Sequence, residues 1–242
     1  MKPSPAEIAR TLACGRIPGR LHPAGHLEPV VVDHATDRAG RPLILVRDGD
    51  DLETGGAVTL SAEDVPPLPR APSLGRVRVT GQLCRLASDE AAAAVDAFAE
   101  ANPVPDLLDV GRGASLCGID VTGVWLDRGP ATIQVDPAGY AAAEPDPLHA
   151  LERDLLADLA DHHAPQIESY FRCLLALTGR PTRVPPRPLR LDRYGFLVDI
   201  GEPDGCVRLS FHRPVHCRHD LAHLLHPVLF PTCPDPPAGG RG

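Results

Sequence analysis

Histidines are concentrated near the end of the sequence. The stretch FHRPVHCRHDLAHLLHP, residues 211–227, contains five of the eleven histidines of the chain, together with Cys217. Within it, His219, His223 and His226 recur at helical spacing, which places all three along one side of a helix. Neutral imidazole is a ligand for Zn, Ni and Cu, and one axial histidine with apolar walls and a cation for the propionates can hold haem.

The pattern leaves three interpretations open. A structural zinc site needs four ligands, and no acidic residue stands where a histidine-rich zinc motif would need its base. Leu221, Leu224 and Leu225 supply the apolar face of the same helix, so the histidines could also be bystanders that flank it. The stretch therefore predicts a helix that carries a haem ligand, a metal site or surface imidazoles.

The composition excludes several classes of protein. The chain has 242 residues, a formal charge of −8 and a pI of about 5.7, so it lacks the basic surface that nucleic-acid binding needs. Its seven cysteines are odd in number and include no CxxC pair, which argues against a disulfide framework or a zinc ribbon. The N-terminus has no apolar leader, and no apolar run reaches the roughly 18 residues of a membrane span. We therefore expect a soluble, reduced, cytoplasmic protein without membrane or nucleic-acid partners.

The first half of the chain has mostly strand patterns. Ser4 and Pro5 predict the start of a short helix. Two aliphatic runs around a turn at 37–40 predict a hairpin, and the four prolines near the end of 53–72 predict an irregular connection. The other expected elements are strands at 75–86, 115–129 and 131–137, and an alanine-rich helix capped by Ser88.

The second half begins with helical periodicity. Residues 146–179 predict a long helical stretch kinked near Pro165. Two strands, 186–201 and 205–215, are expected to be joined by the turn EPDG, with Gly195 allowing a bend or a close backbone approach in the first of them. Arg208 is expected to pair with Asp192 or Asp199 across the ladder.

The stretch 140–147 contains alanines and prolines and is the expected domain boundary. The expected domains are therefore 1–145 and 146–233, the second closed by a helix over 219–230. A flexible tail is expected at 234–242.

Several of these stretches resemble a known family. GRPLILVRDG, RVRVTGQLCRL and LCGIDVTGVWL leading to VDPAGY are similar to the FMN-binding split β-barrel of the pyridoxamine 5'-phosphate oxidase superfamily, and most of all to the HugZ-type haem-utilisation proteins. DHHAPQIESYF, LDRYGFLVDI and VRLSFHRPV resemble the small domain of unknown function that accompanies such barrels in actinobacterial-type members. The resemblance implies a mainly β plus α+β fold, a split β-barrel followed by a small α+β domain. It also implies a homodimer that packs barrel against barrel.

The sequence departs from the family pattern at three places. The family's helix motif usually begins His-Met-Asn and ends Asp-His; its final histidine corresponds to His163, whereas Asp158 and Ala160 replace the leading His and Asn. The glycine-rich turn of haem-degrading members reads DRGPA here, at 127–131. The loop that holds the FMN phosphate in flavin-binding members corresponds to the acidic DGDDLETGG, which would repel a phosphate. Haem is therefore the expected cofactor and FMN is not, and haem binding or sensing is favoured over turnover.

The resemblance also implies where haem would bind. In HugZ-type proteins the proximal histidine comes from a C-terminal segment, so the candidates for the axial iron ligand are, in order, His226, His223 and His219. Arg76 and Arg78 are candidate partners for the propionates, although arginines that alternate with valines are also what any half-exposed strand shows. His163 is expected either to join the cofactor site or to pack as a buried histidine. No catalytic residue is assigned.

The expected function is that of a cytoplasmic haem-binding protein of haem and iron metabolism that resembles HugZ, with weak oxidative haem degradation as a further activity. Two alternatives come from other classes of protein. One is a non-catalytic adaptor that binds a protein partner, as plastid relatives do, and the other is a flavin- or deazaflavin-dependent reductase. The adaptor predicts a cofactor-free protein with an exposed apolar patch, and the reductase predicts a yellow one.

Overall fold

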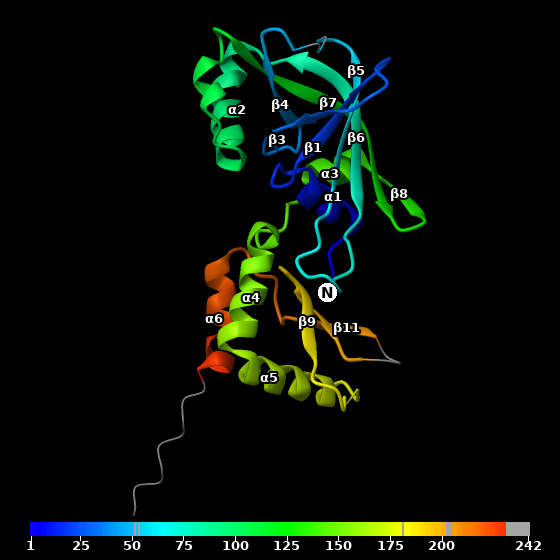
Figure 1. Cartoon of the computed structure of the whole chain (residues 1–242), viewed down its shortest axis with the longest axis vertical. Coiled ribbons are helices and arrows are strands. Elements are labelled where there is room, and N and C mark those ends of the chain that lie inside the picture. Colours follow the sequence, from blue (N-terminus) through cyan, green and yellow to red (C-terminus); the bar gives the residue numbers. More distant parts are fainter. Residues whose placement is uncertain (51, 53, 181, 202–204, 231–242) are drawn as a thin grey trace, which may run out of the picture. The chain divides into compact units, whose positions relative to one another are not determined.

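The computed structural model describes residues 1–50, 52, 54–180, 182–201 and 205–230, with the backbone alone at 88 and 89. The chain divides into two compact units (Figure 1). The barrel unit consists of Pro3–Pro66 and Pro72–Asp146. The C-terminal unit consists of the chain from Pro147 onwards, together with Met1–Lys2 and Pro67–Ala71. The expected tail at 234–242 lies outside the described residues.

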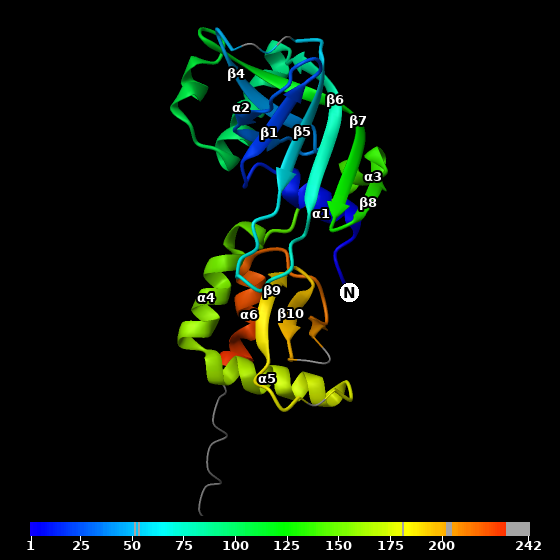
Figure 2. The same ribbon diagram turned by 45° about the vertical axis from the view of Figure 1, so that its right-hand side comes forward.

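The barrel unit is built on a curled antiparallel sheet (Figure 2). Among the described residues, the strands lie in the order β2, β1, β5, β6, β7, β4, β3, and β8 also pairs with β7. Their bounds are β1 Gly19–Pro23, β2 Val30–Val32, β3 His34–Thr36, β4 Pro42–Arg47, β5 Ala57–Glu63, β6 Arg76–Arg85, β7 Ala114–Arg128 and β8 Ala131–Val135. The first half of β7 pairs with β4 and its second half with β8, while β6 pairs along most of its length. A register shift between Thr80 and Gly81 bends the β6–β7 pair, which lets the sheet curl around an aliphatic core.

Strand β5 shows that the predicted irregular connection over 53–72 is wrong. Val58, Leu60 and Ala62 are buried, and the residues between them are more exposed, as in any half-buried strand. The strand pairs with β1 on one side and β6 on the other. The prolines that begin at Pro66 obscured this short run in the sequence, and its stability comes from its two neighbours rather than from its own composition.

Three α-helices are described in the barrel unit: α1 Pro5–Ala13, α2 Ser88–Ala101 and α3 Pro137–Ala142. Ser4 caps α1 as predicted, because its hydroxyl accepts from the Glu7 N–H at 3.2 Å while the Glu7 carboxylate accepts from the Ser4 N–H at 2.8 Å. The predicted cap of α2 is wrong by one position: Ser88 is the first helical residue, and Ala87 is the N-cap.

A buried arginine joins three parts of the barrel unit. Arg10 on α1 is 3% exposed and donates from Nε to the Ala143 carbonyl at 3.0 Å and from Nη2 to the Arg38 carbonyl at 3.2 Å. Its guanidinium lies 5.4 Å from the centroid of the Tyr140 ring, whose hydroxyl donates to the Gly40 carbonyl at 3.0 Å. Burial raises the pKa of Tyr140 to about 12, so this hydroxyl remains a donor. These contacts hold α1, the end of α3 and the β3–β4 turn together.

The C-terminal unit packs helices against a small antiparallel sheet. Among its described residues, the strand order is β11, β10, β9. The bounds are α4 Glu152–His162, α5 Ala164–Leu177, β9 Arg187–Asp192, β10 Gly195–Asp199, β11 Cys206–Ser210 and α6 Arg218–Leu229. The helical stretch breaks at His163, next to Pro165, as predicted. The predicted single strand over 186–201 is wrong, since the chain turns at Arg193 and Tyr194 and forms two paired strands.

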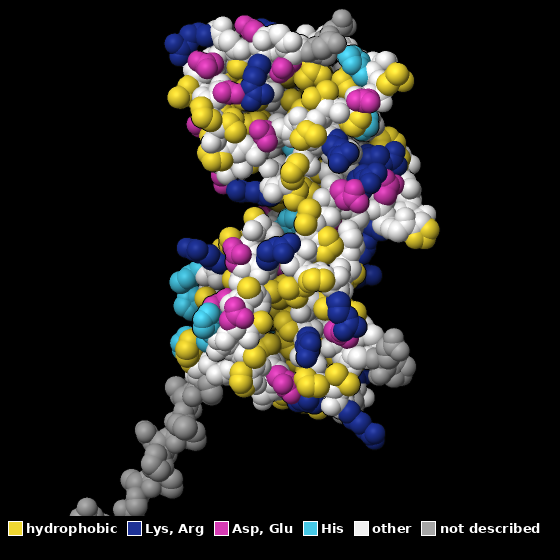
Figure 3. Space-filling view, viewed as in Figure 1, with side chains coloured by type: hydrophobic (Ala, Val, Ile, Leu, Met, Phe, Trp, Pro, Cys, Tyr) yellow, Lys and Arg dark blue, Asp and Glu magenta, His cyan; other side chains and the backbone are white. Residues whose placement is uncertain are grey.

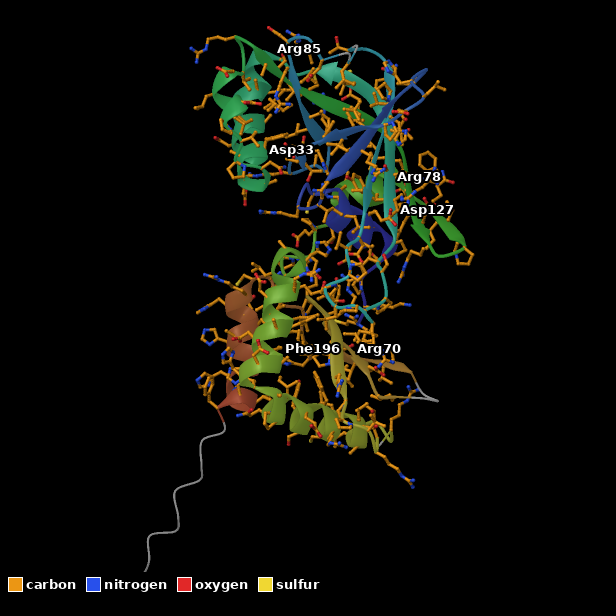
Figure 4. The ribbon with its side chains drawn as sticks, in the orientation of Figure 1. Asp33, Arg70, Arg78, Arg85, Asp127 and Phe196 are labelled. Carbon is orange, nitrogen blue, oxygen red and sulfur yellow. The ribbon has the colours of Figure 1, made fainter. Side chains whose placement is uncertain are left out.

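Aromatic rings and charged pairs stabilise this unit. Phe196 lies at the centre of its core (Figure 4), with ring centroids 5.1 Å from Phe171 and 5.5 Å from Phe211, both edge-to-face. Glu152, at the start of α4, forms a two-pronged ion pair with Arg190 on β9, at 3.1 and 2.7 Å. The expected pair of Arg208 with Asp192 also forms. Helix α4 is therefore fixed to the sheet by a buried charge pair as well as by apolar packing.

We expect Gly195→Ala to lower the free energy of unfolding by about 1–3 kcal/mol. Gly195 has a φ of +144°, and an added Cβ would lie 2.1 Å from the Leu209 carbonyl oxygen, so the predicted close backbone approach is confirmed. Gly205→Ala is the control, because Gly205 also has a positive φ but open space around it. Urea denaturation followed by circular dichroism measures both variants; equal losses would show that the close contact contributes nothing.

Candidate functional site

The three histidines predicted to share one side of a helix are all exposed on α6, while Leu221 and Leu225 on the same helix are 3% exposed and face the core. Imidazole side chains gather along one edge of the C-terminal unit (Figure 3). The three do not act as one group. His219 and His223 contact each other, with their Nε2 atoms 2.9 Å apart, whereas the ring of His226 packs against Phe230.

His226 and His163 both contact one exposed aromatic ring, that of Phe230. The centroid of the Phe230 ring is 5.3 Å from that of His226 and 5.6 Å from that of His163, the latter in an edge-to-face contact. Phe230 is 56% exposed. The break between α4 and α5 positions His163, which caps α4 by donating its N–H to the Leu159 carbonyl. Two residues predicted separately as cofactor ligands thus come together in what we call the His163–Phe230–His226 cluster.

The cluster has the chemistry of a site for a planar apolar ligand with a metal centre. Among the described residues, no hydrogen bond engages a ring nitrogen of His163 or His226, so both imidazoles are available as ligands. The exposed Phe230 ring adds an apolar surface between them. The adjacent His162 is instead paired with Asp158, Nδ1 to Oδ1 at 3.2 Å.

A metal site made of three side-chain ligands does not form here. In the described part of the chain, no group of three or more His, Cys, Asp or Glu side chains is placed to hold a metal ion. The three-histidine interpretation of α6 is therefore wrong. The physical reason is side-chain orientation, since the rings of His219 and His223 contact each other whereas that of His226 contacts Phe230.

Arg76 and Arg78 lie on the outer face of the barrel sheet and already have carboxylate partners. Arg78 forms two hydrogen bonds with Asp127, at 2.8 and 3.1 Å, and its guanidinium lies 5.8 Å from the centroid of the Trp125 ring. This pairing raises the pKa of Arg78 and lowers that of Asp127, and Figure 4 shows the two side by side. Arg76 pairs with Glu63 at 2.7 Å. A propionate would have to displace these carboxylates.

The sequence patterns did not single out two residues, Phe230 and His34, that the structure places in notable surroundings. The signal for Phe230 was present, because it stands four residues after His226 and therefore on the same side of the helical turn. His34 on β3 is 1% exposed, and in the described part of the chain no group meets full hydrogen-bond geometry at either ring nitrogen. Burial lowers its pKa to about 4; the nearby carbonyls of Val32 and Ala13, which lie outside that geometry, and the charge of Asp33 oppose the shift only partly. Nothing in the local sequence distinguishes this buried histidine from an exposed one.

The loop predicted to repel FMN lies between β4 and β5. The Asp50 carboxylate accepts from the Arg47 N–H at 2.7 Å, and residues 51 and 53 lie outside the described part. The turn that replaces the family's glycine-rich motif joins β7 to β8, with Gly129 at a φ of +55°. The absence of FMN stays a prediction.

No described helix is long and apolar enough to cross a membrane.

Comparison with known proteins establishes the fold. The sequence matches no family model and no curated protein. The structure is similar to that of a haem-binding protein from Mycobacterium smegmatis, with a TM-score of 0.71 and 22% sequence identity over 95% of this chain and 97% of that one. A protein of unknown function from Agrobacterium tumefaciens, Atu2129, aligns over the same shares at 17% identity and a TM-score of 0.44. The expected fold class, a split barrel with a smaller α+β part, is confirmed.

Proposed function

We propose that this protein binds haem and that His226 supplies the axial ligand to the iron. The observation that carries the proposal is the His163–Phe230–His226 cluster, in which two imidazoles, neither of them hydrogen-bonded through its ring among the described residues, both contact an exposed apolar ring. Further support comes from the fold that the chain shares with the mycobacterial protein described as haem binding. His219 and His223 engage each other and rank behind His226.

The residues of the cluster fit haem by their chemistry. Haem iron supplies an open axial position for a neutral imidazole, and the porphyrin supplies a flat apolar face. In this chain, His226 would hold the iron, Phe230 would cover apolar porphyrin surface, and His163, which also contacts Phe230, would lie near the bound haem. Arg76 and Arg78 are left out of this assignment because Glu63 and Asp127 pair with them.

We further propose that the protein acts in haem and iron metabolism, as the resemblance to HugZ-type proteins implies. It would do so in the cytoplasm and as a homodimer. Binding or sensing is proposed in preference to turnover, because the turn at 127–131 lacks the run of glycines typical of haem-degrading members. Oxidative cleavage would require O₂ and an external electron donor. Sedimentation of the purified chain reads its oligomeric state directly.

We expect a haemin titration of the purified, untagged chain to saturate at one haem per chain with a sharp Soret band. His226→Ala should weaken binding by about tenfold or more, or shift the band, since an axial ligand is lost. His212→Ala is the matched control, because His212 is an exposed histidine of the same unit outside the cluster. A featureless, non-saturating titration would contradict the proposal; so would equal effects of the two substitutions. Ascorbate added under air then shows whether the bound haem is degraded or stays intact.

A second candidate function is protein binding without a cofactor. The strand β2 is at an edge of the barrel sheet, and three apolar residues of the β1–β2 region are exposed: Leu27 at 101%, Val31 at 70% and Val30 at 46%. An exposed apolar edge strand is suited to pair with a strand of another chain. The haemin titration separates the two functions, because this one predicts no saturable haem binding.

A further inference from the structure

Two histidines of α6 are arranged as a chelating pair. His219 and His223 are one helical turn apart, both are exposed, and their rings meet edge-to-face with centroids 4.3 Å apart. Their Nε2 atoms are 2.9 Å apart, which is a hydrogen-bond distance and requires one ring to donate while the other accepts. The two nitrogens are therefore close enough to bind one ion together after small rotations of their rings.

The distance between the two nitrogens is compatible with a tetragonal coordination geometry. A metal–imidazole bond is about 2.0–2.1 Å long, so two nitrogens 2.9 Å apart subtend an angle of about 90° at a shared metal ion. That is the angle between neighbouring ligands in a tetragonal or square-planar complex, which Cu(II) and Ni(II) favour. A tetrahedral Zn(II) site would need the nitrogens about 3.3 Å apart.

We propose that His219 and His223 bind a divalent metal ion of tetragonal preference, Cu(II) most tightly and Ni(II) next. For both neutral imidazoles to bind the ion through Nε2, the ring that donates the hydrogen bond must carry its proton on Nδ1 instead, so binding changes its tautomer and releases no net proton. Since no third side-chain ligand joins them among the described residues, water or an exogenous ligand completes the coordination. The Irving–Williams order adds to the preference of the geometry for Cu(II) over Zn(II).

This site is separate from the proposed haem site. His226 and Phe230 make ring contacts with each other, and in the described part of the chain no ring contact joins them to His219 or His223. Leu221 and Leu225 hold α6 against the core, so the backbone that spaces the two ligands is fixed by packing. The proposal does not depend on haem binding.

Isothermal titration of the untagged, full chain with Ni(II), which thiols do not reduce, tests the proposal. One ion per chain is expected. His219→Ala and His223→Ala should each raise the dissociation constant by about tenfold or more, because each turns a two-point chelate into a single contact. His212→Ala and His226→Ala are the matched controls and should leave it within about twofold. An unchanged constant in either ligand variant, or an equal loss in a control, would overturn the proposal.

Electron paramagnetic resonance with Cu(II) tests the ligand set itself. The wild-type chain should give an axial signal with hyperfine structure from two imidazole nitrogens, and each single variant should retain one. Cys217 lies at the N-cap of α6 and is exposed, so Cys217→Ser is measured in parallel and should keep the two-nitrogen signal. A signal lost in Cys217→Ser, or tighter binding of Zn(II) than of Cu(II), would overturn the assignment.

Discussion

Glu152→Gln is expected to lower the free energy of unfolding of the C-terminal unit by about 3–5 kcal/mol. Glu152 and Arg190 have side chains only 5% and 6% exposed, and the Glu152 carboxylate also accepts from the Leu191 N–H at 2.8 Å. The substitution keeps the shape of the side chain but removes the Glu152 charge from its buried pair with Arg190 in a low-dielectric setting. Removing one charge of a buried pair is costly even where the intact pair contributes little net stability.

Urea denaturation followed by circular dichroism measures this loss. The transition midpoint should fall by roughly 2 M, taking a denaturant slope of about 2 kcal/mol per molar for a small domain. Hydrogen exchange of the β9 and β10 amides should rise in parallel, because α4 is no longer clamped to β9.

Glu168→Gln is the matched control for Glu152→Gln. It breaks the Glu168–Arg172 pair on α5, whose side chains are 40% and 38% exposed, and should cost less than about 1 kcal/mol. Similar losses in the two variants would mean that burial is not what makes the Glu152 pair important.

The stability of the barrel unit should fall by about 3 kcal/mol as the pH is lowered from 6.5 to about 4, through His34 alone. Folded His34 stays neutral down to a pKa of about 4, whereas in the unfolded chain it is protonated below about 6.5. The unfolded state therefore binds more protons in this range, and protons draw the equilibrium toward it. The stability that neutral His34 contributes to the folded state is fully present above pH 6.5 and is lost as the pH falls toward 4.

His34→Leu isolates this effect from that of the carboxylates. Leucine has a similar volume and does not titrate, and the ring it replaces packs against Gly19. Trp125 is the single tryptophan of the chain and lies in the same unit, so its fluorescence reports the unfolding. The wild type should lose about 3 kcal/mol more than the variant between pH 7 and pH 4. Parallel losses in the two proteins would contradict a buried neutral His34.

Most elements of this protein could be predicted from local patterns. Ser4 followed by Pro5 predicted the start of α1, and the alternation around Arg76 and Arg78 predicted a half-buried strand. The short strand β5 and the turn that separates β9 from β10 were missed. Both depend on neighbours that are distant in the sequence, because a strand of five to seven residues is stabilised by the partners it pairs with.

In the candidate site, too, local patterns predicted some features and tertiary contacts decided others. The spacing of His219, His223 and His226 predicted that all three would lie on one helix, because it matches a period of 3.6 residues, but it left open whether they would bind a ligand or face solvent. Only the tertiary structure decided that His163 meets Phe230, that His219 meets His223, and that His34 is buried. Those contacts join segments or set side-chain orientations through packing, and packing depends on the whole fold rather than on any local pattern.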